Sequence, residues 1–393
     1  MDVNEFKKRG KEMIDFIAEY YENVDNMPPM SSVKPGYLYS LIPHEAPEEP
    51  ESFENIQQDI ETKIMPGMMH WQSSNFFGWY PSSGSFPAML GDMTHSAGQK
   101  ATSIIGCQAR IIPSDANFRL TKCALQAAIT KDRQNGLIPF FVCATFGTTN
   151  TAAIDDLYGI ADVADSEHLW LHIDAAYAGA ALTCPEFRPL ARGIDRAHSF
   201  NFNPHKWLLT NFDCSALWVA DSTHLVNALS IEREYLPKVK GATDFVKDYR
   251  NWELPLGRRF RSLKLWFVMR MYGASGIRAY IRKHVKEAKW LEAQLLEDGR
   301  FEIMAPVVFG LVVFRVKSGI IAGSACDVNK TNAELVRRIN NDGRVFLVGT
   351  NIRGVHVLRP NIGSTYGTSE NTALLVKVIK ECTTKVIAEY SKQ

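Results

Sequence analysis

Three polar residues stand at the ends of apolar runs in the middle of the chain. Asp174 closes L-H-I-D, Lys206 lies in N-P-H-K-W, and Thr149 follows the apolar run 137–145. A carboxylate at the end of a buried strand needs a cation or a strong donor to offset its burial. Apolar surroundings disfavour the charged form of a lysine, which makes its amine a usable nucleophile. Taken singly, such an Asp is more often a helix cap, and such a Lys is more often solvated.

The lysine and the aspartate together indicate a more specific chemistry. A lysine that forms a Schiff base and an aspartate that pairs with a pyridinium nitrogen are the two fixed requirements of enzymes that use pyridoxal 5'-phosphate (PLP). Here D-A-A-Y-A-G begins at Asp174, and Lys206 follows 32 residues later. Chance produces this joint pattern far less often than either residue alone. The sequence therefore favours a PLP site over two unrelated surface residues.

The surrounding pattern predicts an α/β domain that would position these residues. Apolar runs at 137–145 and 169–173 are each followed by a polar turn, helical patterns cover 120–135 and 154–166, and 215–219 forms a further short strand. Continuous apolar runs between helices are typical of buried parallel strands. Ligands of such sheets bind beyond the carboxyl ends of the strands. We expect Thr149, Asp174 and Lys206 to lie there.

Helical patterns flank this domain. The stretch 4–24 is amphipathic, and its apolar stripe needs a partner, which could be another subunit. Ser52 is placed to cap a second helix that Pro66 and Gly67 end. Downstream we expect helices at 262–297, 331–341 and 369–390 and strands at 309–316 and 345–348. We predict an N-terminal helical dimerisation segment (1–85), a large PLP-binding domain (86–263) and a small C-terminal α+β domain (264–393).

Composition narrows the class of protein. The 393 residues are 46% apolar, and 44 Lys or Arg against 43 Asp or Glu give a net charge of +1. This balance argues against a nucleic-acid partner, and no apolar run approaches the ~20 residues of a membrane span. The start of the chain, 1–9, lacks the apolar core of a signal peptide. The seven cysteines show no C-x-x-C pair and no metal-ligand spacing, so we expect reduced thiols and no metal site.

An aromatic stretch at 70–87 is interrupted by Pro, Ser and Gly. Such a loop is either a packed surface or the wall of a site for flat ligands, and the pattern itself leaves both open.

On its motifs the chain resembles the group II PLP-dependent amino-acid decarboxylases, most of all their aromatic-L-amino-acid branch. The matching stretches include I-M-P-G-M-M-H-W-Q-S, H-S-A-G-Q-K-A, I-P-F-F-V-C-A-T-F-G-T-T, W-L-H-I-D-A-A-Y-A-G and S-F-N-F-N-P-H-K-W. The resemblance runs from residue 2 to about 316 and thins toward the C-terminus. It implies the fold of the PLP-dependent transferases (fold type I), with a mixed, mostly parallel sheet in the large domain.

The resemblance also implies a role for each matched residue. Lys206 would hold PLP as a Schiff base, and Asp174 would pair with the ring nitrogen. Ala176 would pack on one ring face, and His95 would stack on the other. The further assignments are Thr149, Asn203 and His205 around the cofactor and the substrate carboxylate; Trp71, Trp79, Tyr80, Pro81, Ser82, His205 and Gly257 in the substrate pocket; and Tyr235, on a mobile loop, as a proton donor to the substrate carbon.

Two of these positions bear on substrate and product. Gly257 stands where histidine decarboxylases of the family tend to carry Ser, and it leaves room for a catechol or an indole. His95 is the residue expected of decarboxylases, whereas related aldehyde synthases carry Asn there. The resemblance thus implies decarboxylation of aromatic L-amino acids (L-DOPA and 5-hydroxytryptophan, with tyrosine and tryptophan as further substrates) to monoamines, in catecholamine biosynthesis, by a cytoplasmic homodimer. Histidine or tyrosine decarboxylation is the alternative within the family.

The chain departs from the family at one place. The stretches 87–93 and 94–98 abut here. In the family, a block of about 100 residues between their counterparts carries the turn and helix N-terminus that bind the cofactor phosphate. No G-S-A-S-like turn occurs in the sequence. We therefore expect an incomplete large domain, and a catalytically defective form that acts only as a dimerisation partner is the alternative of another class.

Overall fold

The structure is a computed structural model of the chain. It describes residues 1–27, 31, 33–34, 36–68, 70, 108, 110–230, 249–252, 259–320, 328–365 and 367–390. The chain forms two compact units, one made of Met1–Gly106 and Ser222–Ser275 and the other of Cys107–Asp221 and Gly276–Gln393. None of the described helices has the length and apolar character that a membrane-spanning helix requires. The described side chains also contain no cluster suited to a metal ion.

In the first unit, polar caps set where the helices begin. α1 (Val3–Asn23) begins after Asp2, whose carboxylate accepts two backbone N–H bonds of 2.8 Å each. α2 (Phe53–Asp59) begins after Ser52, whose hydroxyl accepts the N–H of Asn55 at 3.2 Å, and helical turns continue to Gly67. Both helices were predicted. The short helix α7 (Thr223–Leu229) belongs to the same unit.

A break divides the long helix α8 (Arg261–Asp298) at Gly273, where φ is +61°. A Cβ at this position would lie 2.6 Å from the backbone of Glu49, so only glycine fits the close approach. On the N-terminal side of the break, the guanidinium of Arg270 pairs with the carboxylates of Glu51 and Asp59, the latter at 2.8 Å. These ion pairs hold α2 and the segment before it against α8 within the first unit.

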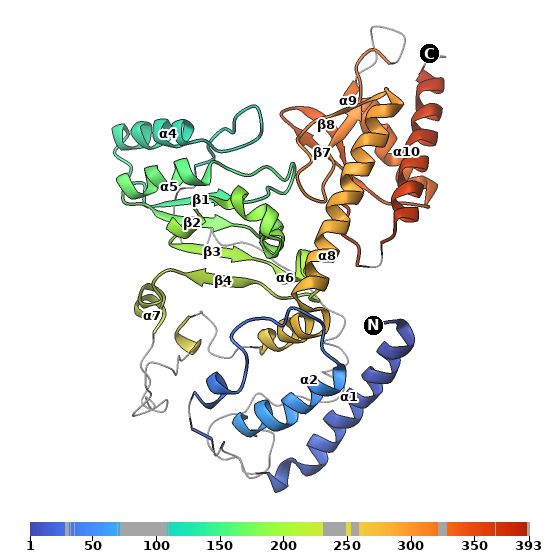
Figure 1. Ribbon diagram of the computed structural model, residues 1–393. Helices are drawn as coiled ribbons and strands as arrows, with labels where there is room; N and C mark the ends of the chain where they lie inside the picture. The colour runs from blue at the N-terminus through green and yellow to red at the C-terminus, as the bar shows by residue number, and fades with distance from the viewer. Residues whose placement is uncertain are drawn as a thin grey trace. The chain divides into compact units, whose positions relative to one another are not determined.

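The second unit contains two four-stranded sheets, and the first has the strand order β1-β2-β3-β4 (Figure 1). The parallel strands β1 (Phe141–Thr145), β2 (Trp170–Asp174) and β3 (Ser199–Phe202) are followed by β4 (Ala216–Val219), which runs antiparallel to β3. This is the mixed, mostly parallel sheet that was predicted. Helices α4 (Lys122–Gln134) and α5 (Leu157–Ser166) lie side by side, and α5 packs on β1 and β2. Fully buried aliphatic side chains, such as Ile160 and Ile173, fill the space between helix and sheet.

Strand β1 and the residues just before it carry large apolar side chains that are exposed. Among the described strands β1 pairs only with β2. Ile138, Phe140 and Phe141 are 86%, 58% and 50% exposed. An edge strand flanked by exposed apolar side chains is a template for association with another chain.

The second sheet forms the core of the small C-terminal part of this unit. Its strands are β5 (Phe301–Ile303), β6 (Phe314–Val316), β7 (Val348–Ile352) and β8 (Val355–Arg359), antiparallel in the order β5-β6-β8-β7. The second half of α8, α9 (Val328–Asp342) and α10 (Ser369–Tyr390) supply the helical layer (Figure 1). Leu295, Phe314, Leu335 and Ile379 are completely buried in one apolar cluster between them.

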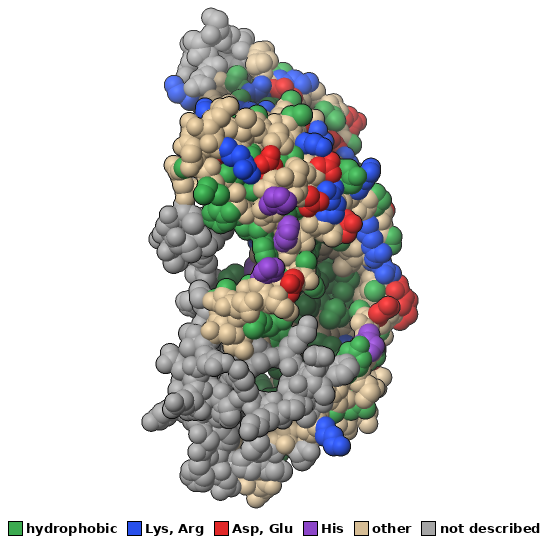
Figure 2. Space-filling view, turned by 90° about the vertical axis from the view of Figure 1, so that its left-hand side faces the viewer, with side chains coloured by type: hydrophobic (Ala, Val, Ile, Leu, Met, Phe, Trp, Pro, Cys, Tyr) green, Lys and Arg blue, Asp and Glu red, His purple; other side chains and the backbone are tan. Residues whose placement is uncertain are grey.

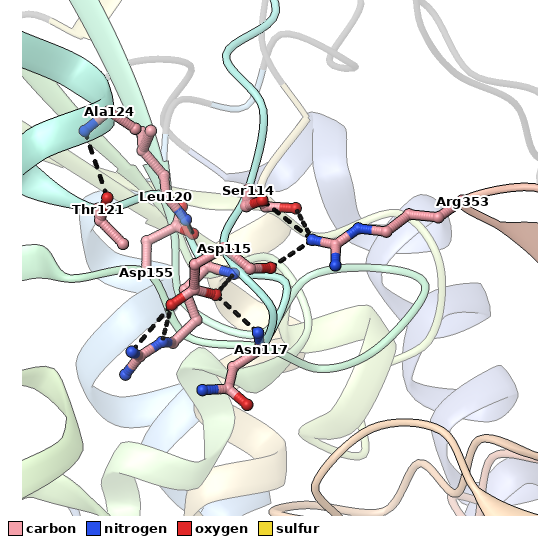
Figure 3. Close-up of polar contacts among 9 residues, drawn as sticks. Ser114, Asp115, Asn117, Leu120, Thr121, Ala124, Asp155 and Arg353 are labelled. Atoms are coloured by element: carbon pink, nitrogen blue, oxygen red, sulfur yellow. Dashed lines mark hydrogen bonds and ion pairs between the residues drawn. The ribbon is translucent and has the colours of Figure 1, made fainter. Parts of the chain in front are cut away.

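A polar network fixes the segment that enters α4 (Figure 3). Asp155, which is 8% exposed, accepts the N–H of Leu120 at 2.6 Å and the N–H of Thr145 at 2.7 Å. Burial raises the pKa of this carboxyl group. In the turn between β7 and β8, Arg353 donates to the carbonyl and hydroxyl of Ser114 at 3.0 Å. The network therefore ties the last residue of β1 to the chain before α4 and to the small sheet.

The surface carries charges of both signs. On the face drawn in Figure 2, Lys and Arg side chains are interspersed with Asp and Glu side chains over the described residues, in keeping with the net charge of +1.

Candidate cofactor site

Asp174 lies at the carboxyl edge of the parallel strands, where a ligand of this sheet is expected. It is the last residue of β2 and is in register with Thr145 of β1 and Asn201 of β3. Its carboxylate is half-buried, and Oδ1 accepts the N–H of Ala176 at 2.9 Å. The acidic group is therefore oriented by the backbone that follows it, and Ala176 is brought to its side.

Small residues allow the loops after the strands to approach one another closely. Gly147, after β1, has φ of +87°, and a Cβ there would lie 2.4 Å from the Cβ of Ala178. Gly179 is packed so tightly that a Cβ would lie 2.4 Å from the Cβ of Phe202. The glycines in F-G-T-T and D-A-A-Y-A-G therefore serve close packing at the sheet edge.

Lys206 is in the one-turn helix α6 (Pro204–Trp207) that follows β3. Its N–H donates to the carbonyl of Asn203 at 2.9 Å, and the N–H of Asn203 donates to the carbonyl of Ala176 at 3.1 Å. Two consecutive backbone hydrogen bonds thus connect the lysine helix to the loop that carries Asp174.

One expectation about Lys206 was wrong. The sequence predicted a lysine in apolar surroundings, but its side chain is exposed, whereas Trp207 and Leu208 are 1% and 4% exposed. Successive side chains of a helix point about 100° apart, so burial of the neighbouring indole does not bury the amine. The side chain of Lys206 is therefore accessible.

The other described site residues lie in or beside α6 or on the loop after β1. His205 places Nδ1 2.7 Å from the carbonyl oxygen of Cys214, and Asn203 accepts the hydroxyl of Ser215 at 2.7 Å. Both contacts tie α6 to the entrance of β4. Thr149 is exposed on the loop after β1, and its carbonyl accepts the Nε–H of Arg359 at 2.8 Å.

The remaining predicted site residues lie outside the described residues. They are His95, Tyr235 and Gly257, and the aromatic-loop residues Trp71, Trp79, Tyr80, Pro81 and Ser82. Their proposed roles therefore stay predictions.

A group of aromatic side chains that was not predicted from the sequence connects the two motifs. Tyr177 stacks on Trp207 with the ring centroids 5.0 Å apart and an interplanar angle of 18°. The Trp207 Nε1–H donates to Nδ1 of His284 at 3.0 Å. The Tyr177 hydroxyl accepts the N–H of Gly310 at 3.2 Å, and burial raises the pKa of this phenol. The sequence signal that could have predicted the stack is the aromatic residue in each motif, Tyr177 in D-A-A-Y-A-G and Trp207 in N-P-H-K-W.

The chemistry of this donor set fits PLP in part. A primary amine and a carboxylate share one edge of the sheet, as a Schiff base and a ring-nitrogen contact require. Among the described residues, no contact indicates where the cofactor phosphate would bind. The fit is thus to the aldehyde and the ring of the cofactor.

Comparison with known proteins gives a consistent result. The family model of the pyridoxal-dependent decarboxylase conserved domain matches residues 35–97 and 92–317. Aromatic-L-amino-acid decarboxylase of Mus musculus is 39% identical over 456 residues, covering 91% of this chain and 93% of the relative. Tyrosine decarboxylase 4 of Petroselinum crispum and phenylacetaldehyde synthase of Arabidopsis thaliana are each 36% identical to this chain. Each alignment covers 97% of this chain, and the alignments cover 94% and 96% of the two relatives, respectively.

Solved structures agree with this fold. The Oryza sativa TDC with PLP and tryptamine matches with a TM-score of 0.72 and 30% identity over 98% of this chain and 99% of its own. The Catharanthus roseus tryptophan decarboxylase with L-tryptophan matches with a TM-score of 0.69 and 31% identity over the same shares.

The comparisons also bear on the predicted gap. The two segments of the family match overlap at 92–97, around the position where the sequence predicts missing residues. The alignment with the mouse relative extends over 456 positions, whereas 91% of this chain is about 358 residues, so about 100 positions of the relative have no counterpart here.

Proposed function

Because the chain belongs to the pyridoxal-dependent decarboxylase family, we propose that it removes the carboxylate of an aromatic L-amino acid as CO2 and releases the monoamine. The observation that carries this proposal is the pair of backbone hydrogen bonds that join the Asp174 loop to the Lys206 helix through Ala176 and Asn203. The substrate class follows from the relatives, whose names specify aromatic amino acids, tyrosine and tryptophan.

In this proposal each residue of the chain has one task. Lys206 would hold PLP through the cofactor aldehyde, and Asp174 would favour the protonated ring nitrogen by placing a negative charge beside it. When bound, PLP would supply an electron sink for the electron pair that the departing carboxylate leaves behind. Ala176 and His95 would contact the ring. Thr149, Asn203 and His205 would bind and orient the substrate carboxylate for its departure.

The residues outside the described part complete the proposal. Tyr235 donates a proton to the substrate Cα, and Gly257 leaves space for a catechol or an indole. The aromatic-loop residues Trp71, Trp79, Tyr80, Pro81 and Ser82 line the pocket for the flat side chain. His95 favours the amine over the aldehyde as product.

We also propose a cytoplasmic homodimer with the domain limits 1–85, 86–263 and 264–393. No residue of α1 is buried, and Phe6 and Ile14 are each 65% exposed, which supports a partner for this helix. The described cysteines Cys123, Cys143, Cys184, Cys214 and Cys382 are free thiols, which suits a reducing compartment. The pathway we propose is catecholamine biosynthesis.

Activity with a panel of substrates tests the reaction. Purified protein with added PLP is offered L-DOPA, 5-hydroxytryptophan, L-tyrosine and L-histidine, and CO2, amine and aldehyde are measured. We expect CO2 and amine in equal amounts from an aromatic L-amino acid, and no release by Lys206→Ala. Preference for L-histidine would overturn the substrate class, and aldehyde as the main product would overturn the reaction.

A second candidate function rests on the gap of about 100 positions against the mouse relative. A chain that cannot retain the cofactor would act only as a dimerisation partner. Size-exclusion chromatography of the PLP-treated protein separates the two functions. A homodimer that carries PLP and releases CO2 supports the enzyme, whereas a PLP-free chain that pairs with a full-length relative supports the second candidate.

A further inference from the structure

The residue that follows Lys206 is buried and donates one side-chain hydrogen bond to a distant helix. Trp207 is 1% exposed, and its Nε1–H donates to Nδ1 of His284, which is 2% exposed, at 3.0 Å. The two rings are nearly parallel, with an interplanar angle of 16°. His284 comes from the second half of α8, 77 residues further along the chain. A distant helix thus contacts the lysine segment at its one buried aromatic side chain.

The chemistry of the two rings fixes the protonation of His284. An indole N–H can only donate, so Nδ1 of the imidazole must be the acceptor and carry no proton. The proton is therefore on Nε2, which lies 3.1 Å from the carbonyl oxygen of Ser364 and donates to it. Both ring nitrogens are used, and the neutral form is the one that fits. Burial also lowers the pKa of His284, in agreement with this assignment.

Trp207 also contacts the segment that carries Asp174. Tyr177, three residues after Asp174, stacks on the Trp207 indole with the ring centroids 5.0 Å apart. The Tyr177 hydroxyl is held by the N–H of Gly310 and lies 3.3 Å from Oδ1 of Asn361. The indole therefore touches both the aspartate loop and α8.

The lysine helix depends on such contacts for its orientation. α6 has four residues, and a single helical turn has too few internal hydrogen bonds to be stable without external contacts. Besides the contacts of Asn203, the side chains of α6 itself bond to Cys214 through His205 and to His284 through Trp207. Loss of the second anchor would let the turn that presents Lys206 rotate or fray.

We propose that His284 is a positioning residue for the cofactor lysine: by holding the Trp207 indole against Tyr177, it fixes the orientation of Lys206 relative to Asp174. The proposal rests on the proposed function, because it assigns Lys206 to PLP. His284 acts through Trp207 and takes no part in proton transfer to the substrate.

Variants at His284 separate hydrogen bonding from packing. His284→Leu has a side chain of similar volume but offers no acceptor to the indole. His284→Gln retains a carbonyl oxygen that can accept this N–H. His356→Gln is the matched control, because His356 is a half-buried histidine of the same unit whose pKa is also lowered by burial.

Three readouts are measured on each variant: the dissociation constant of PLP from its visible absorbance, the fraction of chain that borohydride traps as a pyridoxyl adduct on Lys206, and kcat and KM for the best aromatic substrate. We expect His284→Leu to bind PLP about tenfold more weakly and to lower kcat about tenfold at unchanged KM, the effect of one lost hydrogen bond of ordinary strength. We expect His284→Gln to recover most of both losses and His356→Gln to match the wild type.

The outcomes distinguish this inference from the proposed function. If the wild-type chain forms no pyridoxyl adduct on Lys206, the proposed function and the role of His284 fall together. If the wild type is trapped and His284→Leu is trapped equally well with an unchanged kcat, only the positioning role is overturned. Should His284→Leu not fold, Trp207→Phe removes the same N–H while retaining the stack on Tyr177, and the same tenfold losses are expected.

Discussion

Removal of the Asp155 carboxylate should destabilise the second unit more than any exposed acidic substitution. This carboxylate accepts the N–H of Leu120 at 2.6 Å (Figure 3). It also accepts the N–H of Thr145 at 2.7 Å, and Asp155 is 8% exposed. Asp155→Ala leaves both backbone donors without an acceptor. A buried donor without a partner costs about 1–3 kcal/mol, so the two together should lower the free energy of unfolding by about 2–6 kcal/mol.

Urea unfolding followed by circular dichroism measures this loss, with Asp195→Ala as the control. Asp195 is an exposed aspartate of the same unit, and substitutions at such positions usually change stability by less than about 0.5 kcal/mol. Asp155→Asn offers one acceptor for the two donors and should fall between Asp155→Ala and the wild type. Because Thr145 pairs with Asp174, Asp155→Ala should also weaken PLP binding. If Asp155→Ala unfolds within about 0.5 kcal/mol of the control at the same m-value, the assigned role of this network is refuted.

Two further predictions concern pH and association. Burial lowers the pKa of His284 below its ordinary value of 6.5, so the unfolded chain binds a proton below that pH more readily than the folded chain does. The free energy of unfolding should therefore fall as the pH drops through 6.5, and it should fall less steeply in His284→Gln. Equal pH slopes of the two proteins in urea titrations would contradict this. Ile138 is 86% exposed beside β1 and should promote association between chains. Ile138→Lys should therefore reduce light scattering at high protein concentration. Unchanged scattering would contradict association through this edge.

The helices and their caps could be predicted because their signals are local. The expected helix 262–297 is observed as Arg261–Asp298, and the capping role of Ser52 is confirmed. The break at Gly273 was not predicted, since it arises from contact with a segment more than 200 residues earlier. Strand β3, Ser199–Phe202, was missed because S-F-N-F is neither a continuous apolar run nor a long alternating one.

The candidate site divides in the same way. Asp174 and Lys206 could be placed at the sheet edge because each follows a recognisable strand or lies in a short motif. The exposure of the Lys206 side chain depends on how its helix is oriented, which no local pattern fixes. The bond from Trp207 to His284 spans 77 residues, and the contact of Tyr177 with Asn361 spans 184. Such pairs follow from tertiary packing, which brings distant segments together.

The central claim is that the amine of Lys206 binds the aldehyde of PLP. Incubation of the wild-type chain with PLP, reduction with borohydride and mass spectrometry of the peptides test it directly, with Lys264→Ala as a control lysine substitution. We predict a pyridoxyl group on the peptide that contains Lys206, retained in Lys264→Ala and lost in Lys206→Ala. A chain that carries no such group, or that carries it equally on other lysines, would contradict the account.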